Sequence, residues 1–83
     1  MLLVGEAPCL TTQARYYLLE EETGAYGVRI ELGEEAASAA DLSPSRSRVW
    51  ELAARLLRGG VPPVALRAVV DAWLLVCAGG GGN

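Results

Sequence analysis

The most regular pattern in the chain is a strict alternation of apolar and polar positions over residues 26–33. Such alternation is typical of a strand with one buried face and one face in water. Residues 14–21 place aromatic and aliphatic residues together before a run of acids, which favours another strand. Gly24, in the segment 22–25, can take the positive φ of a short hairpin loop. The pattern therefore predicts a β-hairpin.

Two neighbouring segments can extend this hairpin into a meander. Residues 34–42 are rich in alanine and glutamate, which favour a helix, whereas a strand here would share the core face of the hairpin. We interpret them as a weak third strand, with a helix as the alternative. Residues 1–12 can add an edge strand, which we expect Pro8 to keep short. The expected sheet thus has two to four strands within residues 1–42.

A first helix is predicted over about residues 44–58. Ser43 is suited to the N-cap and Pro44 to the first helical position, where a missing N–H costs nothing. The glycine pair 59–60 then favours termination. Between these signals one face is apolar and the other is charged. The apolar stripe consists of Val49, Trp50, Leu52, Ala53, Leu56 and Leu57.

A second helix is predicted over about residues 63–77, with Pro63 in its first turn. It is apolar almost all round, with Arg67 and Asp71 as its charged residues, so we expect it to be buried. The short link between the helices predicts an antiparallel helical hairpin packed on one face of the meander. The expected fold is therefore α+β, with one domain over 1–78 and a flexible glycine-rich tail over 79–83.

Composition limits the class of protein. With 83 residues and a net charge of −3, the chain has room for one core, and its overall field repels nucleic acid. We expect a cytoplasmic protein with no membrane span, because no apolar run approaches the ~20 residues that a span requires. Cys9 and Cys77 are expected to be reduced thiols, with Cys77 packed in the core.

The sequence has no histidine and no lysine, which removes the usual general bases and the Ser-His and Cys-His pairs. We therefore expect a protein that is not an enzyme and that carries no cofactor. The carboxylates of 20–22 and 34–35 could bind Mg²⁺ or Ca²⁺ if the hairpin ends converge. Solvated strand ends that resist aggregation are the favoured interpretation.

Three arginines on the first helix form a candidate face for an anion or an acidic partner: Arg48, Arg55 and Arg58. They could contact the phosphates of a nucleic acid. The favoured interpretation is a solvated face in which Glu51 pairs with Arg55. Tyr16 and Tyr17 are adjacent on a strand and face opposite sides, so they cannot form one base-stacking surface.

Several motifs that span most of residues 15–75 resemble a family of short, uncharacterised bacterial proteins, a domain of unknown function found mainly among Firmicutes. The motifs are Tyr16-Tyr17-Leu18-Leu19-Glu20-Glu21-Glu22, Tyr26-Gly27-Val28, Leu42-Ser43-Pro44-Ser45 and Val61-x-Pro63-x-x-Leu66-x-x-Val69-Val70-x-x-Trp73-Leu74. The resemblance implies a meander followed by a helical hairpin, and it implies no activity.

The apolar excess of the second helix gives the leading functional hypothesis. A helix packed on a sheet and one neighbour does not need apolar residues around its whole circumference. We therefore expect an interaction or regulatory module that binds a protein partner or a second copy of itself. The residues expected to form the interaction surface are Val64, Ala68, Ala72, Leu75 and Val76. Nucleic-acid binding and a carboxylate-dependent metal binder or hydrolase are the alternatives.

The predicted core can be tested by truncation. Tyr26, Val28, Ile30 and Leu32 are expected to pack on Trp50, Leu56, Leu66 and Trp73. Truncating Ile30 or Leu56 to alanine should lower the free energy of unfolding by roughly 2–4 kcal/mol, because each change leaves a cavity. Urea denaturation measures this loss, and a change below about 0.5 kcal/mol at both positions would place them outside the core.

Overall fold

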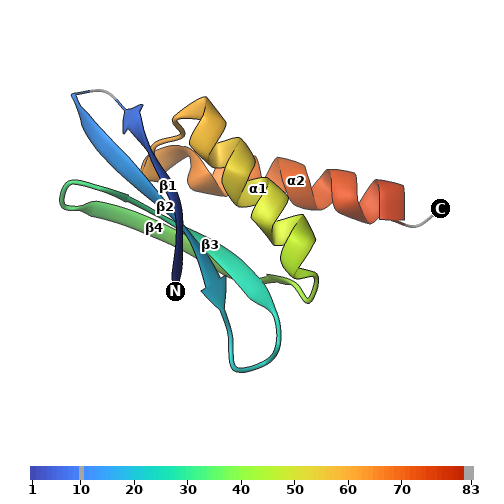
Figure 1. The fold of residues 1–83 in the computed structure, drawn as a ribbon. Helices are drawn as coiled ribbons and strands as arrows, with labels where there is room; N and C mark the ends of the chain where they lie inside the picture. Colours follow the sequence, from blue (N-terminus) through green and yellow to red (C-terminus); the bar gives the residue numbers. More distant parts are fainter. Residues whose placement is uncertain (10, 82–83) are drawn as a thin grey trace.

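In a computed structural model that describes residues 1–9 and 11–81, a four-stranded antiparallel sheet is followed by two α-helices (Figure 1). The strands are β1 (Leu2–Cys9), β2 (Thr12–Glu20), β3 (Tyr26–Leu32) and β4 (Glu35–Ser43). The helices are α1 (Arg46–Gly59) and α2 (Leu66–Gly81), with the short 3₁₀ turn η1 (Pro63–Ala65) before α2. Each strand pairs with the next, which confirms the α+β meander at the upper end of the expected strand count.

Two glycines with positive φ form the turns on either side of β3. Gly24 has φ 89° in the β2–β3 turn, and Gly33 has φ 60° in the β3–β4 turn. Because Leu32 pairs with Glu35, the second turn is a tight two-residue loop. The expected β2–β3 hairpin is therefore confirmed, and the interpretation of 34–42 as a strand is confirmed by β4.

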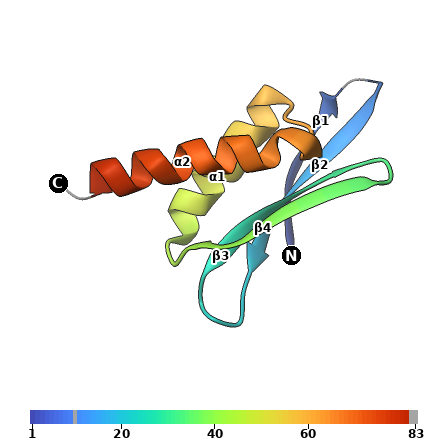
Figure 2. The same ribbon diagram turned by 180° about the vertical axis from the view of Figure 1, so that it is seen from behind.

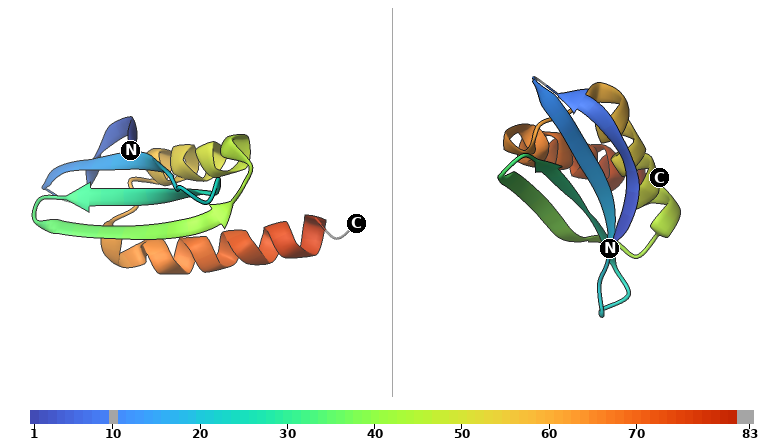
Figure 3. Two further views of the ribbon diagram at one scale, coloured as in Figure 1. Left: turned by 90° about the horizontal axis from the view of Figure 1, so that it is seen from below. Right: turned by 60° about the vertical axis from the view of Figure 1, so that its left-hand side comes forward.

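The core lies between the inner face of the sheet and the two helices. α1 packs mainly on β1, β2 and β3 and also reaches β4, whereas α2 packs on β4, and both helices cover the same side of the sheet (Figures 2 and 3). The largest fully buried side chains are Tyr16, Leu18, Val28, Ile30, Val49, Leu52, Leu56 and Val70. This division of the sheet keeps the helices apart, and they share few contacts.

A bulge in β4 is pressed against Gly27 of β3. Tyr26 pairs with Ser43 while Val28 pairs with Ala39, so residues 40–42 of β4 face the single Gly27. Asp41 in this bulge has φ 52°, a left-handed conformation that residues other than glycine seldom adopt. A Cβ atom on Gly27 would overlap the carbonyl oxygen of Ala39. The close approach therefore requires glycine at position 27.

β1 is longer than expected. It spans Leu2–Cys9 and contains Pro8, which pairs with Gln13 of β2. β1 lies at the edge of the sheet, and a proline N that faces away from the neighbouring strand breaks no ladder hydrogen bond there. The expectation that Pro8 would keep this strand short was therefore wrong.

The N-terminus of α1 is set by Ser45 rather than by Ser43 and Pro44. Ser45 has the extended conformation of an N-cap (φ −90°, ψ 109°), and its hydroxyl accepts a hydrogen bond from the N–H of Arg48. Ser43 instead accepts a hydrogen bond from the N–H of Ser45 through its hydroxyl group. At the other end, Gly60 takes the left-handed conformation that stops the helix.

Trp50 lies outside the core into which the sequence pattern placed it. Its side chain is 37% exposed, whereas Val49 and Leu52 on either side of it along α1 are buried. Trp50 is exposed because it lies one position around the helix from the stripe that faces the sheet. The guanidinium of Arg46 stacks over its ring, 5.7 Å from the ring centre.

α2 also ends later than expected, because the helix continues into the glycine run to Gly81. Adding a residue to an existing helix is cheaper than starting one, which allows glycine to follow despite a cost of ~1 kcal/mol per residue. Residues 82–83 of the expected flexible tail, and the Cys77 side chain expected in the core, lie outside the described part of the chain.

The contact between Gly27 and β4 gives a stability prediction. Gly27→Ala should lower the free energy of unfolding by about 2–3 kcal/mol, because backbone, unlike a flexible side chain, cannot move aside easily. Gly59→Ala in α1 is the matched control and should be neutral or stabilising, since alanine is the better helix former. Urea denaturation of both variants checks this, and equal midpoints would show that β4 does not press on Gly27.

Candidate functional site

α2 leaves the sheet after its first turns. Leu66 and Val70 are buried against the core, but the later part of the helix extends beyond the strands (Figures 1 and 3). The exposed fractions of Val64, Leu75 and Val76 are 84%, 75% and 71%. Ala68 and Ala72 are exposed as well. All five residues that the sequence singled out therefore lie on one solvent-facing part of η1 and α2, which we call the α2 surface.

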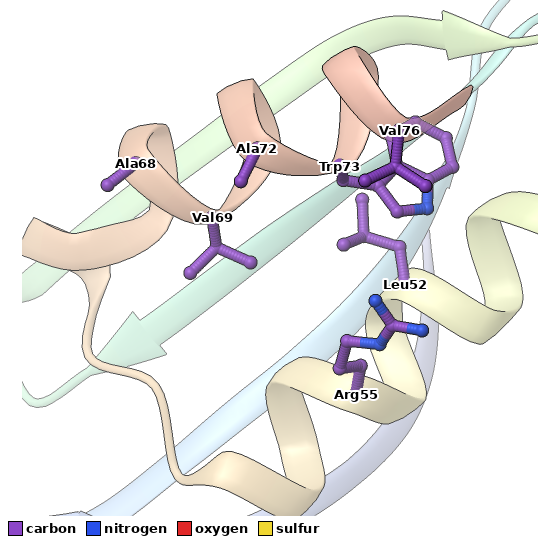
Figure 4. A pocket seen from close by; sticks show the side chains of 7 residues that line it. All are labelled: Leu52, Arg55, Ala68, Val69, Ala72, Trp73 and Val76. Atoms are coloured by element: carbon purple, nitrogen blue, oxygen red, sulfur yellow. The ribbon is translucent and has the colours of Figure 1, made fainter. Parts of the chain in front are cut away.

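A groove of about 340 Å³ lies between α1 and α2 and shares Ala68, Ala72 and Val76 with the α2 surface (Figure 4). Its residues are Leu52 and Arg55 of α1 and Ala68, Val69, Ala72, Trp73 and Val76 of α2. Apart from the guanidinium group of Arg55, which extends from α1 toward the space between the helices, the lining is apolar. The groove exists because α1 does not pack against the small side chains of Ala68 and Ala72.

The arginines expected on one face of α1 are exposed and separate into two places. Arg48, Arg55 and Arg58 are exposed, with Arg55 lining the groove, while Arg46 lies over Trp50. The described residues contain no ion pair between Glu51 and Arg55, so the pairing expected from their spacing was wrong. The three free-standing arginines make the outer side of α1 basic beside the groove.

The two acidic clusters do not converge. Residues 20–22 lie at the β2–β3 turn and residues 34–35 at the β3–β4 turn, at opposite ends of β3 and roughly 20 Å apart. Within the described residues, no three Cys, Asp or Glu side chains gather closely enough to hold a metal ion. Nor does any described helix combine the length and apolarity needed to cross a membrane.

Tyr16 ties the sheet to the segment between the helices. Its side chain is fully buried in the centre of β2, and its hydroxyl donates a hydrogen bond of 2.9 Å to the carbonyl oxygen of Val61. Burial raises the pKa of the Tyr16 phenol, and the nearby thiol of Cys9 adds to this. The phenol therefore stays protonated at neutral pH, and its hydrogen bond holds the segment between α1 and α2 against the sheet.

The outer face of the sheet carries a polar network. The Tyr17 hydroxyl donates to Oε1 of Glu31 at 3.2 Å, and Arg29 Nε donates to Oε2 of the same carboxylate at 3.0 Å. The hydrogen bond from Arg29, supported by that from Tyr17, holds the pKa of Glu31 below its ordinary value. The opposite orientation of Tyr16 and Tyr17 confirms that the two rings do not share a face.

Sequence reasoning missed two features of this region. The groove depends on the separation of α1 from α2, which no local pattern encodes. The Tyr16–Val61 hydrogen bond joins residues 45 positions apart, and its only local signal is a tyrosine on the buried face of a strand, where a hydroxyl needs a partner.

The fold and the surface together define a small α+β protein in which one sheet face is covered and an apolar helix extends past the sheet. A family model described as a family of unknown function (DUF6514) matches residues 4–76, and the chain therefore belongs to that family. This confirms the resemblance to a domain of unknown function. Neither a curated protein nor a solved structure matches the chain.

The Tyr16 hydrogen bond predicts a stability that depends on pH. Tyr16→Phe should cost about 1–2 kcal/mol near neutral pH, because the Val61 carbonyl loses its partner. The folded-state pKa is raised above 10.0, so this stabilisation is complete below pH 10 and is lost as the pH rises through the folded pKa. The difference between parent and variant should therefore shrink between about pH 8 and about pH 11.

Urea denaturation at the two pH values measures this difference. Tyr17→Phe is the matched control, since its hydroxyl contacts a partly exposed carboxylate that keeps its bond from Arg29, and it should cost less at both values. A gap between the parent and Tyr16→Phe that stays constant would show that the phenol does not titrate differently in the folded state.

Proposed function

We propose that this protein is a non-enzymatic protein-interaction module that binds its partner through the α2 surface. The observation that carries the proposal is the exposure of Val64 in η1 and of Leu75 and Val76 on the part of α2 that extends beyond the sheet. Single exposed aliphatic residues are common on monomeric proteins, but a contiguous apolar patch is typical of an interaction site.

The free energy available from burying these exposed side chains is large for a domain of this size. Full burial of one valine or leucine side chain contributes about 1.5–3 kcal/mol. Burial of three such side chains would therefore contribute several kcal/mol of free energy, which is large beside the total stability of roughly 5–15 kcal/mol of a typical protein. A partner that covers the α2 surface would recover this free energy as binding affinity.

The arrangement of reactive side chains supports a role without catalysis. In the absence of histidine and lysine, acid–base chemistry would depend on carboxylates, tyrosine or cysteine. The acidic clusters lie at opposite ends of β3, and Tyr16 and Cys9 are buried in the core. The groove beside the α2 surface is apolar except for Arg55, which suits an apolar side chain better than a polar substrate.

Nucleic-acid binding through Arg48, Arg55 and Arg58 is the second candidate. The exposure of all three side chains favours it, and the net charge of −3 opposes it. A salt titration separates the two candidates, because phosphate contacts give a steep loss of affinity with salt whereas apolar contacts do not.

Site-specific photo-crosslinking in the native host tests the proposal. A photo-reactive phenylalanine analogue in place of Leu75 should give a discrete protein adduct, because this side chain would lie in the interface. The same analogue in place of Leu3, an exposed leucine on β1, is the matched control and should give none. Equal adducts from both positions, or none from Leu75, would contradict the proposal.

A further inference from the structure

We infer that the partner of the α2 surface is a second copy of this chain, bound with its own α2 antiparallel to the first. This inference rests on the proposed interaction function and names its occupant. It is carried by the order of the apolar residues, by the charges beside them and by the area they expose.

The apolar residues of the surface form a palindrome. Val64, Ala68, Ala72 and Val76 follow one another at intervals of four residues, so they form one ridge that begins in η1 and continues along α2. Read in either direction, the ridge is valine, alanine, alanine, valine. A twofold axis between Ala68 and Ala72 therefore places Val64 opposite Val76 of the second copy, and Ala68 opposite Ala72 of the second copy.

This arrangement fits a common class of helix packing. Ridges of residues four apart interdigitate when two helices cross at about −50°, with axes roughly 8–10 Å apart. Alanines at the crossing point allow the shorter separation, and the valines then pack on either side of it. Leu75, adjacent to the ridge, would be covered by the same contact.

The charges beside the ridge are also self-complementary. Arg67 and Asp71 lie on the flank that faces away from α1, and in the monomer they form only a loose pair at 3.8 Å, with side chains 76% and 60% exposed. In an antiparallel pair the same flank of each helix faces its counterpart, with its order reversed. Arg67 therefore comes to face Asp71 of the second copy, and the symmetry repeats this contact.

The midpoint of the two charges supports the same axis. It falls at position 69, whereas the midpoint of the ridge falls at position 70, a difference of one residue or about 1.5 Å along the helix. Two independent patterns, one apolar and one charged, thus place the twofold axis within one residue of each other on α2.

The exposed apolar area sets the expected affinity of the dimer. Each exposed aliphatic side chain contributes on the order of 100 Å² of apolar surface. The α2 surface therefore offers a few hundred Å² per copy, and the dimer would bury roughly 600–1,000 Å², below the ~1,200–2,000 Å² of stable complexes. The inference is therefore a reversible dimer with a dissociation constant in the micromolar range.

Sedimentation velocity over about 1–500 µM protein tests the dimer. The parent mass should rise from 8.7 kDa toward twice that value. Val76→Glu should remain a monomer over the whole range with an unchanged melting temperature at low concentration, since this side chain is exposed in the monomer. Leu3→Glu introduces the same charge on β1 and should dimerise like the parent. A parent that stays at 8.7 kDa would overturn the inference.

A charge exchange tests the antiparallel geometry. Arg67→Asp and Asp71→Arg should each weaken dimerisation by about fivefold, because like charges would then face each other twice. The double variant restores both opposite-charge contacts and should recover the parental dissociation constant within about twofold. Failure of the double variant to recover would overturn the antiparallel arrangement.

The two proposals can fail separately. If the parent is a monomer but Leu75 gives an adduct whose mass is not twice that of the chain, the interaction function stands and the second copy is excluded. If Leu75 gives no adduct, the interaction function itself fails.

Discussion

The hydrogen bond between Tyr16 and Val61 is the constraint on which the arrangement of both helices depends. Tyr16 stands at the centre of the inner sheet face, and its hydroxyl would be costly to bury without a partner. By accepting this bond, the carbonyl of Val61 holds the segment between the helices over β2. This segment follows the end of α1 at Gly60 and leads through η1 into α2, which packs on β4.

The exposure of α2 follows from this starting point. A helix of 16 residues is about 24 Å long, and β4 can cover only the part of it that contains Leu66 and Val70. α1 packs mainly on the other three strands and shares few contacts with α2, so it leaves the remainder uncovered. Trp73 still packs against the core, but the apolar side chains of Leu75 and Val76 are not buried by the fold itself.

The elements with strong local signals could be predicted from the sequence. The alternation over β3 fixed its buried face, and glycines marked the β2–β3 turn and the end of α1. Features that depend on neighbours could not be predicted. The only sign of the bulge at Asp41 in the sequence is a glycine, Gly27, within a predicted strand. Trp50 is exposed because it lies one position around α1 from the residues that face the sheet. The α2 surface could be identified by its composition, but its exposure could be judged only once β4 was placed.

The fold offers two other places where a second chain could add, and both are obstructed. β1 is an edge strand with exposed apolar residues at its start, but a register shift between Leu3 and Gly5 makes it irregular, and Pro8 has no N–H to offer to an added strand. β4 is the opposite edge, and the bulge with the left-handed Asp41 bends it. Bulges and prolines are the devices by which sheets avoid pairing with other strands. Strand addition is therefore disfavoured at both edges, which is consistent with the proposed contact between helices, because α2 is the helix that extends beyond the sheet.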